Sequence, residues 1–134
     1  GRAAERFAQM CAGLGGPAGL IETPDAHLPT AAVQQAIMPA QPGNITAMDT
    51  RRLGLAVMEL GGGRRRADDK INYAVGLSQM TAIGAPVDQH NPICVIHAAD
   101  EDDAARVARL VQDAVTIGGE SGPDEPIVRE RIAP

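Results

Sequence analysis

The sequence predicts an α+β domain with a mainly antiparallel sheet and two packed helices, preceded by one further helix. Short runs rich in β-branched residues are separated by Gly and Pro turn signals. Two longer segments carry apolar residues at helical spacing directly after an aspartate. The 134 residues suit one domain, which would bury roughly two-thirds of its unfolded surface. With no Trp, one Tyr and one Phe, its core must consist of Val, Ile, Leu, Met and Ala.

Residues 1–29 predict a helix and a linker ahead of the main domain. The apolar stripe of this helix consists of Ala3, Phe7, Met10 and Leu14. The stretch over 15–29 is too rich in Gly and Pro for regular structure. Because the chain starts at Gly1 and enters a helical pattern at once, we expect a further segment to precede it.

Residues 30–134 are the predicted main domain. Alternation over 30–40 predicts a strand, the Pro42-Gly43-Asn44 turn closes it, and 45–48 predict a second strand. Residues 71–80 predict a strand or an extended loop. The segment 84–87 leads into the clearest strand, over 92–97.

Two helices are predicted inside this domain. Asp49 caps the first, whose apolar face is Leu53, Ala56, Val57 and Leu60. Asp100 caps the second, whose first turn is acidic and whose Arg106 lies four residues after Asp102. Its apolar face is Val107, Leu110, Val111 and Ala114. A loop over 118–126 and a terminal edge strand over 127–132 complete the order β-β-α-(β)-β-α-β.

Composition excludes several classes of protein. The net charge of −5 and the scarcity of aromatic residues argue against nucleic-acid binding. No apolar run approaches the length of about 18 residues that a membrane span needs. Cys11 and Cys94 are far apart and lie among apolar residues, which favours reduced thiols in a cytoplasmic protein.

The run Gly61-Gly62-Gly63-Arg64-Arg65-Arg66 has the composition of a phosphate-binding loop. Such loops precede a helix, where free N–H groups face the anion. Here the glycines follow the predicted helix, so we interpret Gly61 as its cap and the arginines as cations near its negative end. An alternative hypothesis keeps Arg64, Arg65 and Arg66 as a substrate-binding loop beside a cleft, touching an anion that is held elsewhere.

Cys94, His97, His27 and His90 are candidate metal ligands. Residues three apart on a strand point to opposite faces, so Cys94 and His97 are not expected to share one ion. His27 and His90 lie in expected loops without a ligand pair at zinc-site spacing. We therefore expect no metal site and interpret Cys94 as a small buried apolar residue.

The acidic residues also lack the features of an active site. Those at 100–103 suit the start of a helix, and the adjacent pair at 68–69 gives no evidence of an acid and a base facing one bond. No Ser-His-acid set or nucleophile elbow is present. We therefore assign no catalytic residue.

Several stretches in one order make the chain resemble the C-terminal region of the pyrimidine nucleoside phosphorylase family, to which thymidine phosphorylase belongs. They are residues 48–57, 60–65, 69–76, 84–87, 92–93 and 95–98, with 1–7, 16–17 and 27–30 ahead of them. The resemblance implies an α/β hammerhead-like domain over 30–134, preceded over 1–29 by the closing helix and linker of an α/β domain.

The resemblance also implies a function. In the family, thymidine phosphorylase is a pentosyltransferase of nucleoside salvage, which converts thymidine and phosphate into thymine and 2-deoxyribose 1-phosphate. The family's catalytic and substrate-binding residues precede the point matched by Gly1, so none is carried over. This chain is then expected to be a structural domain, inactive alone, whose partner is the remainder of a homodimeric phosphorylase. Inorganic phosphate is the co-substrate and no cofactor is implied.

Two other functions stay open. The Gly84-x-x-Val87 pattern and the Asp69-Lys70 pair are similar to parts of lipoyl and biotinyl carrier domains. However, the modified lysine of a carrier follows the strand that contains the Gly-x-x-Val pattern, whereas Lys70 precedes this pattern here. The other alternative is a stand-alone interaction module. An apolar N-terminal helix face that needs a partner argues against that independence.

Overall fold

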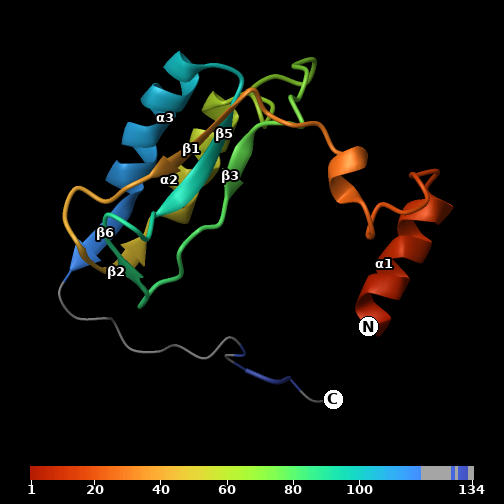
Figure 1. Cartoon of the computed structure of the whole chain (residues 1–134), viewed down its shortest axis with the longest axis horizontal. Coiled ribbons are helices and arrows are strands. Elements are labelled where there is room, and N and C mark those ends of the chain that lie inside the picture. Colours follow the sequence, from red (N-terminus) through yellow and green to blue (C-terminus); the bar gives the residue numbers. More distant parts are fainter. Residues whose placement is uncertain (119–127, 129, 133–134) are drawn as a thin grey trace. The chain divides into compact units, whose positions relative to one another are not determined.

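The computed structural model describes residues 1–118, 128 and 130–132. The chain divides into two compact units, Gly1–Thr30 and Ala31–Pro134. The first holds helix α1 (Arg2–Gly13) and the short 3₁₀ helix η1 (Pro24–Ala26), as Figure 1 shows. The prediction that the linker has no regular structure is therefore wrong at one turn, where Pro24 occupies the first helical position that its fixed φ favours. The predicted stripe of α1 is exposed at Phe7, Met10 and Leu14.

The second unit contains two three-stranded antiparallel sheets, whereas the sequence predicted one mainly antiparallel sheet. The first sheet has the order β1 (Val33–Ile37), β5 (Cys94–Ala98), β3 (Gly76–Ser78). The second has the order β4 (Pro86–Val87), β2 (Gly43–Met48), β6 (Val115–Gly118). Both are antiparallel throughout, so the α+β class is confirmed.

Strand β6 is absent from the prediction. It begins at Val115, directly after a helix, where the backbone turns from helical to extended (φ −115°, ψ 128°). Its pairing with β2, in which Val115 lies opposite Met48, supplies backbone partners across the sheet. The segment 84–87, predicted as a lead-in, contributes β4, which also pairs with β2. Of the predicted strand over 127–132, residues 128 and 130–132 carry no helix or strand, so the prediction is wrong there, and residues 127 and 129 lie outside the described residues. Of the predicted loop over 118–126, Gly118 belongs to β6 and the rest lies outside the described residues.

The two helices of this unit begin where the sequence predicted. They are α2 (Thr50–Glu59) and α3 (Glu101–Ala114). Asp49 Oδ1 accepts a hydrogen bond from Arg52 N at 3.0 Å, and Asp100 Oδ1 accepts one from Asp103 N at 2.8 Å. Each bond satisfies one of the N–H groups that a helix start leaves unpaired.

An aliphatic core joins these elements. Residues of β5 alternate between buried and half-buried, so one face of the first sheet is apolar. Helix α3 packs on β5 and β1, and α2 packs beside α3 on the same side of that sheet (Figure 1). The side chains that are most completely buried are Ile37, Ile45, Ile93, Ile96, Val87, Val107, Val111 and Cys94. Tyr73 and Phe7 are both exposed, so the predicted aromatic-free core is confirmed.

Candidate functional site

The glycine and arginine loop follows α2 as a helix cap. Gly61 has a φ of +88°, a left-handed conformation that strains any residue with a Cβ. Gly61 N donates to Met58 O and Gly62 N donates to Val57 O, both at 3.0 Å. This pair of bonds is the Schellman motif, which satisfies carbonyls at the end of a helix. The interpretation of Gly61 as a helix cap is confirmed.

The backbone of the arginine loop folds around one carboxylate of the same chain. Asp69 Oδ2 accepts hydrogen bonds from Arg65 N at 2.9 Å and from Arg66 N at 2.8 Å. Asp69 N in turn donates to Arg66 O at 3.2 Å. Two successive N–H groups could hold an external anion. Here Asp69 satisfies them, which gives that acidic residue a structural role.

A charged network joins this loop to both helices. The Glu59 carboxylate binds Arg65 through Oε1 and Arg106 Nη1 through Oε2, the latter at 2.8 Å. Arg106 Nη2 also contacts Asp103 Oδ1 at 2.5 Å and Glu59 O at 3.2 Å. The hydrogen bond to Asp103, together with the charges of Asp103 and Glu59, raises the pKa of Arg106. Arg106 thus pairs with Asp103 and not with Asp102, because residues three apart on a helix also share a face.

The network borders an open cavity of about 440 Å³. Its lining consists of Met58, Glu59, Gly61, Gly63, Arg65, Asp69, Lys70 and Arg106. Three cations and two carboxylates share this lining, and the carboxylates bind groups within it. The formal charge of the lining is therefore only +1, which is less positive than the cluster of free cations that a dedicated phosphate site provides.

The three predicted loop arginines therefore differ in their surroundings. All are exposed, and Arg65 forms an ion pair with Glu59 at the end of α2. Within the part of the chain that the structure describes, Arg64 and Arg66 form no ion pair. The sequence indicated Arg106 only as a helix partner of Asp102 and did not predict its place in this candidate site. Arg106 lies 47 residues from Glu59, and no local spacing indicated their contact.

The candidate metal ligands lie apart from one another. Cys94 is buried in the core, whereas His97 is half-buried on the other face of β5. Burial raises the pKa of the Cys94 thiol to about 11, which suits the predicted apolar role. His97 Nε2 lies 2.7 Å from Ser78 Oγ on β3, a contact that the sequence did not predict. A Ser-His hydrogen bond resembles half of a catalytic triad, but no carboxylate contacts His97 among the described residues.

The other two histidines belong to turns. His27 ends η1, and His90 is exposed in the turn before β5. Asp88 Oδ1 accepts hydrogen bonds from His90 N at 2.7 Å and Asn91 N at 2.9 Å. These bonds, the first above all, lower the pKa of Asp88. Over the described residues, no three His, Cys, Asp or Glu side chains gather as a metal site would require.

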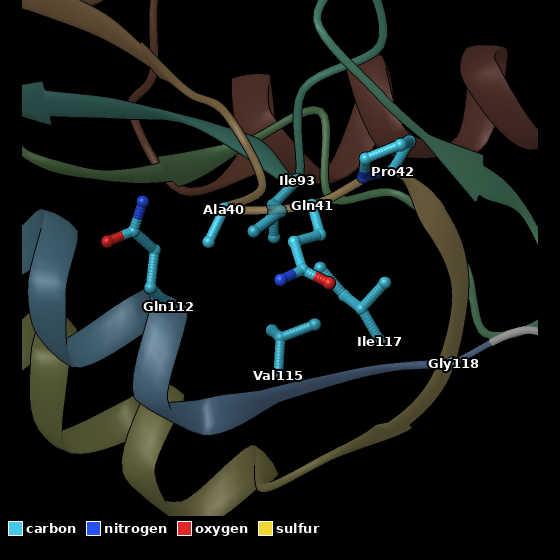
Figure 2. Close-up of a pocket in the computed structure, with 8 residues that line it drawn as sticks. All are labelled: Ala40, Gln41, Pro42, Ile93, Gln112, Val115, Ile117 and Gly118. Atoms are coloured by element: carbon cyan, nitrogen blue, oxygen red, sulfur yellow. The ribbon is translucent and has the colours of Figure 1, made fainter.

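A second cavity, of about 400 Å³, lies between the β1–β2 connection, the end of α3 and β6 (Figure 2). The apolar walls of this cavity include Ile93, Val115 and Ile117, and its polar lining includes the side-chain amides of Gln41 and Gln112. Gln112 Nε2 donates to Met38 O at 3.0 Å, which ties α3 to the end of β1. No charged residue lines this cavity in the described part of the chain.

The described residues contain no buried polar or charged side chain. They also contain no helix that is long and apolar enough to cross a membrane. Lys70 is exposed in the connection between α2 and β3, and after β5 the chain enters α3. In a carrier domain the modified lysine follows the strand that the Gly84-x-x-Val87 pattern resembles, whereas Lys70 precedes that segment here. The structure therefore gives no support to the carrier hypothesis.

The family model of the pyrimidine nucleoside phosphorylase C-terminal domain matches residues 44–118. The match runs from β2 to β6, so it includes both helices of the second unit and the arginine loop between them.

Proposed function

Because this match covers more than half of the chain, the protein belongs to the pyrimidine nucleoside phosphorylase family, and we propose that it is the structural C-terminal domain of a thymidine phosphorylase. In the proposed reaction the bond between C1′ of deoxyribose and N1 of thymine breaks. A bond between C1′ and an oxygen of hydrogen phosphate forms, and the proton that phosphate gives up is taken up by thymine as it leaves. The observation that carries the proposal is the family match over 44–118.

The chemistry of glycosyl transfer is the reason for placing the catalytic groups outside this domain. Phosphate and the leaving base carry charge in the transition state, and their stabilisation needs several preorganised donors in a dry site. The described residues bury no polar side chain, and their largest charged cluster is internally neutralised. The groups that hold phosphate and nucleoside then belong to the remainder of the phosphorylase, which is the proposed partner of this domain.

The arginine loop is the part of this domain that we place beside the substrate cleft. Asp69 and Glu59 fix the backbone and one guanidinium of the loop. Arg64 and Arg66 keep exposed cationic heads. Such heads attract an anion over about a Debye length, roughly 10 Å at moderate salt, so they suit a supporting contact to phosphate held by other residues.

The proposed enzyme is a cytoplasmic homodimer. Both cysteines are free thiols, which fits a reducing compartment such as the cytoplasm. The resemblance to the family suggests a homodimer.

Thymine release from thymidine and phosphate, followed by ultraviolet absorbance, tests the proposal. The assay compares this chain alone, the intact phosphorylase, and the intact enzyme with Arg64, Arg65 and Arg66 changed to Ala. We expect no turnover by the chain alone, and a higher KM for phosphate with an unchanged KM for thymidine in the triple variant. Turnover by the chain alone would overturn the structural role, and unchanged kinetics of the triple variant would remove the loop from the cleft. A parallel assay with uridine decides the nucleoside.

A further inference from the structure

Arg106 binds the end of α2 from a different helix. Its Nη1 contacts Glu59 Oε2 at 2.8 Å, and its Nη2 contacts Glu59 O at 3.2 Å and Asp103 Oδ1 at 2.5 Å. Glu59 is the last residue of α2, so its carbonyl is one of those that a helix end leaves unpaired. One planar guanidinium therefore holds both the backbone and the side chain of Glu59, a geometry that the single ammonium of lysine does not provide.

Glu59 passes this constraint on to the arginine loop. With Oε2 held by Arg106, Oε1 of the same carboxylate binds Arg65. The backbone of Arg65 is held in turn by Asp69. A continuous series of contacts thus runs from α3 through Glu59 to the loop, across 47 residues of sequence.

We propose that Arg106 and Glu59 are positioning residues, which hold the loop of Arg64, Arg65 and Arg66 in the conformation that presents its cationic heads. The effect on phosphate binding rests on the proposed function, whereas the effect on the loop does not. The Gly61 cap remains when the network is broken, because its two hydrogen bonds are made by backbone atoms. Loss of the network therefore frees the Arg65 side chain and loosens the loop, which is then held by Asp69 and the Gly61 cap, while the domain stays folded.

Because the network is partly exposed to solvent, salt can weaken its ion pairs. The side chains of Glu59 and Arg106 are 37% and 45% exposed, so solvent screens their attraction. At about 1 M salt the Debye length falls to about 3 Å. High salt should loosen the loop in the wild type and should have little further effect once the network has been removed.

Limited trypsin digestion of this chain reports the loop directly, because the loop itself supplies the cleavage sites. The variants are Arg106→Gln and Glu59→Gln, with Arg109→Gln as the matched control, an exposed arginine of α3. Mass spectrometry identifies cleavage after residues 64–66, and urea unfolding monitors the domain. We expect the first two variants to be cut about three to ten times faster in the loop with nearly unchanged unfolding midpoints. The control should match the wild type, and Arg106→Lys should restore less than half of the protection.

The outcomes separate this inference from the proposed function. Loop cleavage that is unchanged in both variants, or accelerated equally in the Arg109 control, overturns the positioning role. In the intact phosphorylase, Arg106→Gln should raise the KM for phosphate and leave the KM for thymidine unchanged. Faster loop cleavage without any change in the phosphate KM would support the positioning role and overturn the placement of the loop beside the cleft.

Discussion

Replacing Gly61 by Ala tests the helix cap on which the loop depends. Gly61 has a φ of +88°, and an added Cβ would meet no atom within 4 Å. The cost is therefore that of the backbone conformation, about 1–2 kcal/mol for an L-residue. Ala also restricts the unfolded chain, which returns about 0.4–1 kcal/mol. The free energy of unfolding should consequently fall by about 1 kcal/mol.

Urea unfolding followed by circular dichroism measures this change. With an m-value of about 2 kcal/mol per molar, the midpoint should fall by about 0.5 M. Gly61→Asn is the conformational control, since Asn tolerates positive φ and should lose less. Gly62→Ala is the steric control, because its Cβ would lie 2.9 Å from Val57 Cγ1. A Gly61→Ala midpoint at or above that of the wild type would refute the reasoning, and so would an Asn variant less stable than the Ala variant.

Three further predictions concern the core and the caps. Ile96 is fully buried and lies on β5, the strand that pairs with β1 and β3. Ile96→Ala should therefore lower the free energy of unfolding in urea by about 3 kcal/mol. A loss below about 1 kcal/mol would contradict its central place in the core. Asp100→Ala should cost about 1 kcal/mol in the same assay, and restoration by Ser would identify the cap as the cause. Burial raises the pKa of Cys94 to about 11, above the ordinary value of about 8.5. The resulting stabilisation is complete below about pH 8.5 and is lost as the pH rises toward 11. The wild type should therefore lose stability relative to Cys94→Ala over that interval, and parallel pH profiles of the two proteins would count against burial of the thiol.

Local chemistry was sufficient to predict the helices and their starting points. Asp49 and Asp100 each precede an apolar stripe, and a short side chain needs only its own backbone neighbours to cap a helix. Gly61 was identifiable for the same reason, since positive φ at a helix end favours glycine. By contrast, β6 directly follows α3, and its four residues become a strand because β2 lies beside them. Short strands depend on such pairing more than on intrinsic preference.

The side-chain contacts of the candidate site were also not predictable from the sequence. The sequence identified the arginine loop and its place after a helix, yet it gave no sign of the partner that holds the loop. Glu59 and Arg106 lie on different helices, and their contact exists because α2 and α3 pack side by side. Ser78 and His97 meet in the same way, across two paired strands.

For this protein the sequence alone determined the α+β class, the aliphatic core, the helix caps and the family resemblance. Each depends on residues that are near one another in the chain or on composition. The tertiary structure decided the division into two sheets, the existence of β6 and the Arg106–Glu59–Arg65 network. These features arise from contacts between distant segments, whose register is set by the packing of the whole domain.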